Sequence, residues 1–538
     1  MGGFPGPRIH VGRAVKQAWR GIGILLYVAV IFGPLLMLIF ASFRGVVSDD
    51  AGILALIIPS GRRLRLFCNS VAYAGAVAAG GMLLGTLAAL SLWRVKRGLW
   101  SQVRWLVVVF AAIPPYIHSL AWAKAVPFVS SVAPGGGQGM VLQGWPGAWW
   151  VQMMALLPLA VGLALVGLES IDPRLLEAGR VQQDDLRVLT AVGLPLAVPM
   201  LMAGAGLLFI LSLLDYSVPA LFHVNVYSLD VFAEFSASGR PERAFLAAFP
   251  LIILAAIVVF LSQRTFRRVA LRPSWGVSSW SAPPAWPAWF RVVEWTGGGV
   301  LGAQMAVMFI ALMAATGSVG ALMAGVGGGS REILFSGLIA VFAAIFSVPL
   351  AVLAAEGAVA GGVRQWLWWF LITLPLAVPA PLVGMGLVSM WNRALPMEVY
   401  GTAAMPVLAA LSRFVPFGAL VMVAQLRRLD PRLLEAARIL RPGWLVTRVR
   451  IWLPMMAPGL IAAAAVCFAL TIGELGATLI VAPPGRATVT MRVYNLLHYG
   501  ADDQVAGLCL MIVIVTLAAA IAAAGALLHC GRGLSRGR

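Results

Sequence analysis

The residues with the most informative types and spacing belong to a repeated charged heptapeptide. Asp-Pro-Arg-Leu-Leu-Glu-Ala occupies positions 172–178 and again 430–436, which are 258 positions apart. Each copy carries a glutamate and, three residues later, an arginine, the spacing of an ion pair on one helix face. An aspartate N-cap followed by proline at the first helical position starts a helix. The repeat therefore predicts two short surface helices whose chemistry is polar contact with a partner.

The segments around the repeat show which elements must position it. Each copy is followed by a Leu-Pro pair, Leu194-Pro195 or Leu453-Pro454, that opens a long apolar segment. The chain has 538 residues, of which 61% are hydrophobic and only 11% charged. Lipid must be the solvent for most of such a chain. A charged segment repeated between apolar halves indicates a membrane protein built from two copies of one unit.

The apolar runs predict an all-α polytopic membrane protein with twelve spans, six in each half, because a helical span needs about 20 apolar residues. We expect a first half at residues 1–262, a Pro- and Trp-rich cytoplasmic linker at 263–296, and a second half at 297–538. The predicted spans are 22–42, 68–92, 105–126, 148–169, 194–216, 244–262, 297–322, 333–355, 367–390, 402–425, 453–480 and 504–527.

The basic residues predict the orientation. The formal net charge is +19, but the lysines and arginines stand in short clusters between apolar runs. This distribution is typical of cytoplasmic loops and excludes a nucleic-acid partner. Placing both termini inside puts most of the 39 basic residues in cytoplasmic segments, as the positive-inside rule requires. Both heptapeptides then lie on the cytoplasmic side, between the fourth and fifth span of their half.

The repeated segments resemble a known family. Glu177-Ala-Gly-Arg180 and Glu435-Ala-Ala-Arg438, each followed by Leu-Pro, are similar to the EAA loop of permease subunits of bacterial ABC importers. In that family the loop is a coupling helix that docks on the ATP-binding subunit. The distance from glutamate to proline is 18 residues in the first copy and 19 in the second, so the two docks are predicted to differ. The resemblance implies the coupling residues Asp172, Leu176, Glu177, Ala178, Arg180, Asp430, Leu434, Glu435, Ala436 and Arg438.

The resemblance also implies partners and a substrate. Fused halves and the stretch Thr471-Ile-Gly-Glu-Leu-Gly-Ala-Thr478 resemble ferric-iron(III)-type permeases, with thiamine, polyamine and phosphonate permeases as alternatives. No lysine follows a glycine, so the chain lacks the Gly-Lys of a nucleotide-binding loop. ATP and Mg²⁺ are then expected in two copies of a separate ATP-binding subunit. An extracytoplasmic substrate-binding protein and the bacterial inner membrane complete the expected surroundings.

Ionisable groups inside the spans are candidates for the translocation path, because such groups are costly in lipid. Asp215 and Glu474 stand 259 positions apart, as the two Leu-Pro pairs do. They are expected to line a path or gate; alternatively, they cap local backbone or pair with Arg413. Tyr116 and His118 follow a Pro-Pro pair and are further candidates. No catalytic residue and no metal site is predicted, since ligand spacing is absent.

Two other classes of function remain as alternatives. A secondary transporter of the major-facilitator type also has twelve spans in two halves, but its signature loop between spans two and three carries an acidic residue. Here that loop reads Arg94-Val-Lys-Arg-Gly-Leu-Trp100. A membrane enzyme would need a nucleophile and base or a metal cluster, and the sequence offers neither. The place of the heptapeptide between spans four and five favours the importer permease.

Overall fold

The computed structural model describes residues 21–47, 56–94, 104, 107, 109–132, 142–270, 284–392, 399–429, 444–499 and 502–536. Within these ranges the regular structure is helical and no strand occurs. Helices are expected for a chain that is mostly surrounded by lipid, because every backbone N–H and C=O must then be satisfied within its own segment. This part of the chain confirms the all-α prediction.

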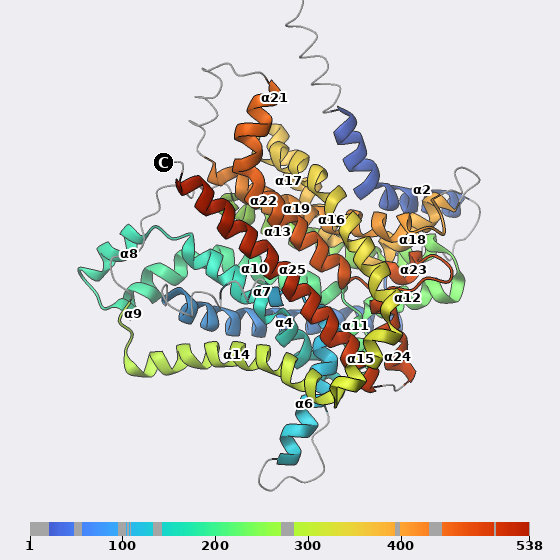
Figure 1. Ribbon diagram of the computed structural model, residues 1–538, viewed down its shortest axis with the longest axis horizontal. Helices are drawn as coiled ribbons and strands as arrows, with labels where there is room; N and C mark the ends of the chain where they lie inside the picture. The colour runs from blue at the N-terminus through green and yellow to red at the C-terminus, as the bar shows by residue number, and fades with distance from the viewer. Residues whose placement is uncertain are drawn as a thin grey trace, which may run out of the picture.

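Long helices form the body of the molecule (Figure 1). In the first half of the chain they are α2 (Gly33–Val47), α4 (Gly61–Arg94), α6 (Pro115–Val132), α7 (Gly144–Glu169), α10 (Leu194–Leu214) and α13 (Pro241–Ala270). In the second half they are α14 (Ala288–Thr316), α15 (Val319–Gly328), α16 (Ser330–Val359), α17 (Val363–Thr373), α18 (Ala380–Trp391), α19 (Ala404–Arg428), α22 (Leu453–Ile472) and α25 (Asp502–Arg536).

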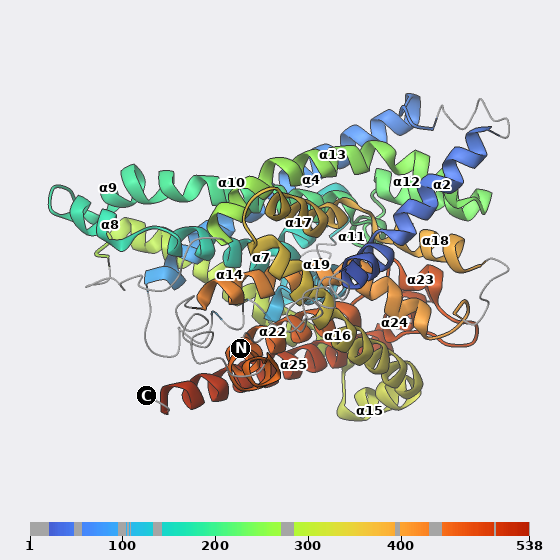
Figure 2. The same cartoon turned by 90° about the horizontal axis from the view of Figure 1, so that it is seen from above.

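Short helices join the long ones. They are α8 (Pro173–Arg180), α9 (Asp185–Val188), α11 (Ser217–Leu221), α12 (Tyr227–Ser238), α21 (Trp444–Thr447), α23 (Thr478–Val481) and α24 (Val489–Tyr499), with π-helices η1 (Leu189–Gly193) and η3 (Arg448–Trp452) and the 3-10 turn η2 (Leu374–Ala377). In both views α8 and α9 lie at one end of the molecule and α12, α23 and α24 lie toward the other (Figures 1 and 2).

Nine helices of the described ranges are long and apolar enough to cross a membrane, or eleven if each of two bent pairs is one span. The predicted count of twelve is not confirmed. The remaining segment, predicted at 105–126, is interrupted: its described residues turn at Ile113-Pro114 before α6 begins at Pro115. Proline lacks a backbone N–H and breaks the ladder of helical hydrogen bonds, so this segment is no continuous span.

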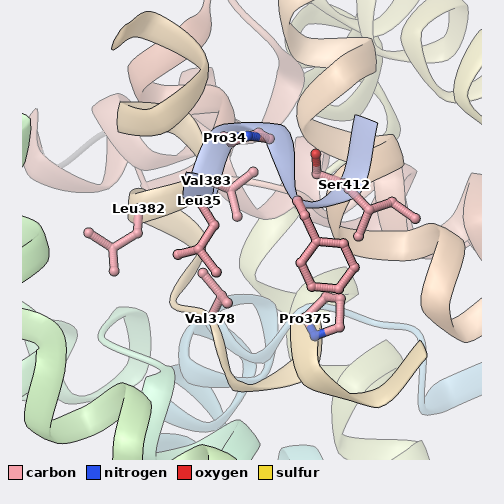
Figure 3. A pocket seen from close by; sticks show the side chains of 9 residues that line it. Pro34, Leu35, Pro375, Val378, Leu382, Val383 and Ser412 are labelled. Atoms are coloured by element: carbon pink, nitrogen blue, oxygen red, sulfur yellow. The ribbon is translucent and has the colours of Figure 1, made fainter. Parts of the chain in front are cut away.

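The two bent pairs meet around a small hollow. Gly21–Ile31 and Gly33–Arg44 are bent by 61°, and Val363–Ala377 and Ala380–Trp391 by 101°. Pro34, Leu35, Pro375, Val378 and Leu382 converge there (Figure 3). Its volume of about 10 Å³ has room for one water molecule. The hollow is thus a packing defect between broken helices and too small for a solute.

A structural unit recurs along the chain at the offset of the Leu-Pro pairs. The succession α9, η1, α10 begins at residues 185, 189 and 194, and the succession α21, η3, α22 begins 259 positions later, at 444, 448 and 453. Prolines recur as well: Pro158 of α7 matches Pro416 of α19 at the heptapeptide offset of 258, and Pro199 of α10 matches Pro458 of α22 at the Leu-Pro offset of 259. The local backbone therefore repeats where the heptapeptide repeats.

The first helix of each half packs on the other half. α14 lies against α4, where Gly297 approaches so closely that an added Cβ would come within 2.6 Å of the Ala88 backbone nitrogen. α2 lies against α18, where Gly386 touches the backbone of Pro34. Glycine permits this approach because it has no side chain. The crossed packing joins the halves into one body.

The two helices that flank the predicted linker extend into its range. α13 continues to Ala270 and α14 begins at Ala288, so both helices extend into the range 263–296. The arginine-rich start of this range contains no helix breaker, and the last proline, Pro287, directly precedes α14. The predicted domain boundaries stay a prediction.

Candidate functional site

The first heptapeptide forms α8, a two-turn helix at one end of the molecule (Figure 1). The Asp172 side chain accepts a hydrogen bond from the Arg174 backbone N–H at 3.0 Å, and Pro173 occupies the first turn. Both features match the predicted start of a helix. This N-cap satisfies one of the backbone donors that a helix leaves free at its beginning.

The two leucines of the heptapeptide point in opposite directions. Leu176 is 1% exposed and packs with Val188 and Leu189 in the core of the first half. Leu175 is 52% exposed and Val181 is 85% exposed, and Ala178 between them is exposed too. Residues three apart lie on one side of a helix, so Leu175, Ala178 and Val181 form an apolar strip facing outward. Leu176 was the predicted coupling residue, but the leucine that is exposed to a partner is its neighbour, Leu175.

An ion pair fixes α8 against α9. Arg180 contacts the Asp185 carboxylate at 2.7 Å, and Asp185 also accepts a hydrogen bond from the backbone N–H of Ala285. The next residue, Trp286, is buried in the core of the first half. The end of the linker is therefore bound to the same carboxylate that holds the candidate coupling helix. Glu177 is half-buried within α8.

The second heptapeptide lies outside the described residues, and so do the candidates Asp430, Leu434, Glu435, Ala436 and Arg438. The elements that flank it are described. α19 ends at Arg428 before it, and α21 and η3 follow it. Since η1 and η3 each end directly before a Leu-Pro pair, the two π-helices occupy the same place in the repeat. π-helices are rare and are frequently found at functional sites.

Asp215 and Glu474 perform the same local task in the two halves. Asp215 accepts hydrogen bonds from the Ser217 hydroxyl at 2.7 Å and from the Ser217 and Val218 backbone N–H groups. Glu474 accepts one from the Ala477 backbone N–H at 2.6 Å. Each carboxylate thus caps the short helix that follows its span, α11 or α23. This geometry corresponds to the alternative in which the two carboxylates cap local backbone.

Arg413 joins the two carboxylates into one cluster. Its Nη1 contacts the Glu474 carboxylate, and it interacts electrostatically with Asp215 and Tyr216. The Glu474 side chain is 3% exposed, while that of Arg413 is 26% exposed. The charged cluster of Asp215, Arg413 and Glu474 therefore takes residues from α19, from the end of α10 and from the residues after α22. It stands where the two halves meet.

The structure brings together these three path candidates and places the other two elsewhere. Tyr116 packs in the apolar core between α6, α14, α24 and α25. His118 is 0% exposed, and its Nδ1 lies 2.6 Å from the Gln304 side-chain nitrogen. Gln304 accepts a hydrogen bond from Trp122 with its oxygen, so its amide nitrogen donates to His118. His118 thus connects α6 to α14.

Sequence reasoning missed three polar residues beside the charged cluster. The Tyr216 ring stacks on Phe232 and interacts electrostatically with Asp215, Arg413 and Tyr494. The Gln152 amide approaches the Asp215 carboxylate but makes no well-aligned hydrogen bond in the described structure. A lone amide in the apolar helix α7 is a detectable signal, whereas Tyr494 is brought in only by folding. Among the described residues, no three His, Cys, Asp or Glu side chains are arranged to hold a metal.

Comparison with known proteins gives the family context. No protein-family model matches the chain. Over 177 residues, 32% of the chain, it is 28% identical to the 2-aminoethylphosphonate transport system permease protein PhnV of Salmonella paratyphi A. Over 150 residues, 27% of the chain, it is 31% identical to the corresponding protein PhnU of Salmonella typhi. The chain is homologous to transport-system permease proteins.

The homology covers part of each permease. The match spans 66% of the length of PhnV and 52% of PhnU. Both relatives are permease proteins of transport systems, which agrees with the resemblance of the heptapeptides to the coupling loop of such permeases. The family relation and the membrane-spanning helices together identify a multi-pass membrane protein.

Proposed function

We propose that this permease is the membrane subunit of an ATP-binding-cassette importer, and that it forms the path through the bacterial inner membrane. The observation that carries the proposal is the repeated unit of a short helix, a π-helix and a Leu-Pro span. Each unit follows a heptapeptide of the coupling-loop type. A pair of matched surface segments suits a pair of identical motor subunits.

The partners follow from this role. Two copies of an ATP-binding subunit, carrying ATP and Mg²⁺, dock on the α8 segment and on its counterpart at 430–438, and the permease has no ATPase site of its own. The exposed apolar strip of Leu175, Ala178 and Val181 supplies the desolvated centre that a protein interface needs. A substrate-binding protein delivers the solute at the opposite face. Both chain termini then lie on the cytoplasmic side.

The proposed substrate is a phosphonate. The relatives' names refer to 2-aminoethylphosphonate, which fits the phosphonate alternative and does not support the iron(III) expectation. The resemblance to ferric-iron permeases rests on the stretch from Thr471 to Thr478. In this stretch the Glu474 side chain caps the start of α23, and the Thr478 hydroxyl donates a hydrogen bond to the Glu474 carbonyl.

The coupling function is tested by removing both glutamates of the heptapeptides. The permease is co-expressed with the ATP-binding subunits, as wild type and as Glu177→Ala with Glu435→Ala. We expect the double variant to reach the membrane in normal amount and to bind the ATP-binding subunit at least about tenfold more weakly, as for loss of interface hot spots. Arg364→Gln, an exposed arginine of α17, is the control. Unchanged assembly and ATP-driven uptake in the double variant would contradict the proposal.

A further inference from the structure

The charged cluster has the composition of a binding site for a small zwitterion. On the basis of the importer function proposed above, we propose that Arg413 binds the oxyanionic group of the transported solute while Asp215 binds an ammonium group of the same molecule. The two residues come from different halves of the chain. A phosphonate with an amino group two carbons away has this chemistry.

The charge balance of the cluster distinguishes a zwitterion from a simple anion. Two carboxylates, Asp215 and Glu474, accompany one guanidinium, Arg413. The summed charge of these three groups is negative. An anion without a positive group of its own therefore meets net repulsion at this site. A solute that brings an ammonium group along with its oxyanion has a partner for Asp215 as well as for Arg413. Electrostatic complementarity of this kind gives specificity.

Arg413 is equipped for the anionic end. A guanidinium has five N–H donors in a planar fork that fits phosphate-like oxygens in a bidentate manner. The described structure assigns one of its nitrogens, Nη1, to Glu474. The side chain is 26% exposed although it stands 14 residues, about 21 Å along a helix, before Arg427 at the end of α19. A charged group at that depth faces a cavity or a partner.

Asp215 and Glu474 differ in what the fold leaves accessible. Glu474 is 3% exposed, holds the Ala477 N–H and contacts Arg413, so it orients the arginine. Asp215 is only half-buried. An ionised carboxylate has about four acceptor positions, and the three hydrogen bonds recorded for Asp215 come from Ser217 and Val218. The Gln152 amide also approaches this carboxylate, so accessibility, and not an empty acceptor position, makes Asp215 rather than Glu474 the carboxylate for an ammonium group.

Two buried polar groups beside the cluster make no well-aligned hydrogen bond in the described structure. The Tyr216 hydroxyl belongs to a side chain that is 6% exposed, and the Gln152 amide to one that is 0% exposed, and neither makes a hydrogen bond. Both interact with or approach Asp215. Leaving such groups unsatisfied costs about 1–3 kcal/mol each. A polar solute beside Asp215 would supply the missing partners of both groups.

Arg413 has no counterpart in the first half of the chain. The capping carboxylates are symmetric, but the position that matches Arg413 at the heptapeptide offset is Ala155. An arginine that served only to neutralise a capping carboxylate would be expected in both halves. A single arginine beside two carboxylates instead creates one asymmetric site, which suits one asymmetric solute.

The test uses the complete complex with its ATP-binding subunits and a saturating binding protein in proteoliposomes. The probes are 2-aminoethylphosphonate and ethylphosphonate, which lacks the amino group. The variant Arg413→Gln with Glu474→Gln replaces the ion pair by a neutral pair that retains the cap to Ala477. We expect its uptake of 2-aminoethylphosphonate to fall at least tenfold, while the complex with the ATP-binding subunits still assembles.

Asp215→Asn retains an acceptor for the cap and removes the charge. We expect it to lower uptake of 2-aminoethylphosphonate relative to ethylphosphonate by about tenfold compared with wild type. Arg364→Gln is the matched control and leaves both rates unchanged. Normal uptake by the neutral-pair variant in an assembled complex would overturn the site and leave the importer function standing. Failure of wild type to bind the ATP-binding subunit would overturn the importer function itself.

Discussion

The two halves of the chain share features of their backbone geometry and differ in their charged side chains. Both place a π-helix before a Leu-Pro span and a proline inside it, and both end that span with a carboxylate that caps a short helix. Only the second half supplies an arginine to that carboxylate. Only the first half has the ion-paired Asp185; the matching position in the second half is Trp444. Backbone geometry was thus kept after duplication while side chains acquired separate roles.

The first prediction concerns α8, where the neighbouring residues Leu175 and Leu176 differ most clearly in exposure. Leu175→Asp places a charge in the exposed strip, and we expect binding of the ATP-binding subunit to weaken by about thirtyfold or more, the effect of losing an interface hot spot. Leu176→Ala removes a buried side chain and is expected to destabilise the permease by about 2–5 kcal/mol instead. Pull-down assays and thermal unfolding in detergent separate the two. Equal effects of both variants on binding and on stability would refute the opposite roles.

The second comparison is between the symmetric caps. Glu474→Gln removes the carboxylate that contacts Arg413 and leaves only Asp215 as its anionic partner, and breaking such a pair is expected to cost about 3 kcal/mol. Asp215→Asn retains an acceptor for Ser217 and is expected to cost less than about 1 kcal/mol. Thermal unfolding of the two variants measures the difference. Equal losses of stability would mean that the halves use their carboxylates alike.

The third comparison concerns the crossed packing. Gly297→Ala inserts a methyl group against the backbone of α4, and overpacking of this kind costs about 1–3 kcal/mol. Gly302→Ala lies on the same helix with nothing within 4 Å of the added carbon, and it serves as the control. A lower unfolding temperature is expected for the first variant only. If both variants unfold alike, α14 does not depend on close contact with α4.

The smallest expected effect concerns the N-caps of the heptapeptides. Asp172→Ala removes the hydrogen bond to Arg174 and costs about 1 kcal/mol of helix stability. Hydrogen exchange of the α8 amides should accelerate about fivefold, while α7 and α10 keep their protection. The same measurement on Asp430→Ala shows whether the second heptapeptide starts a helix in the same manner. Unchanged exchange in α8 would contradict the capping role of Asp172.

Local patterns in the sequence were sufficient for some of these features. The Asp-Pro start of α8 follows from capping and from the fixed φ of proline, both of which act within a few residues. The correspondence of Asp215 with Glu474 follows from counting residues from the Leu-Pro pairs. Most membrane-spanning helices follow from the length of apolar runs, because lipid imposes the same requirement on each of them. The interruption at Pro114-Pro115 is also a local effect.

Other features depend on contacts between distant residues. The inward direction of Leu176 depends on α9 and η1, which pack against α8. The path candidates Tyr116 and His118 were grouped with Arg413 by their polarity, but α14 takes up His118 through Gln304. The extension of α13 and α14 into the range predicted as linker, 263–296, also depends on the fold, because a segment without helix breakers carries no local stop signal.

The sequence by itself determined the duplication, the membrane character and the two heptapeptides, since each is a pattern of neighbouring residues or a fixed offset along the chain. Only the tertiary structure decided that Asp215, Tyr216 and Arg413 lie together and that the first helix of each half packs on the other half. Those arrangements join residues about 200 positions or more apart. Their energy comes from packing and from charge interactions across the halves, and no local pattern encodes which distant groups will meet.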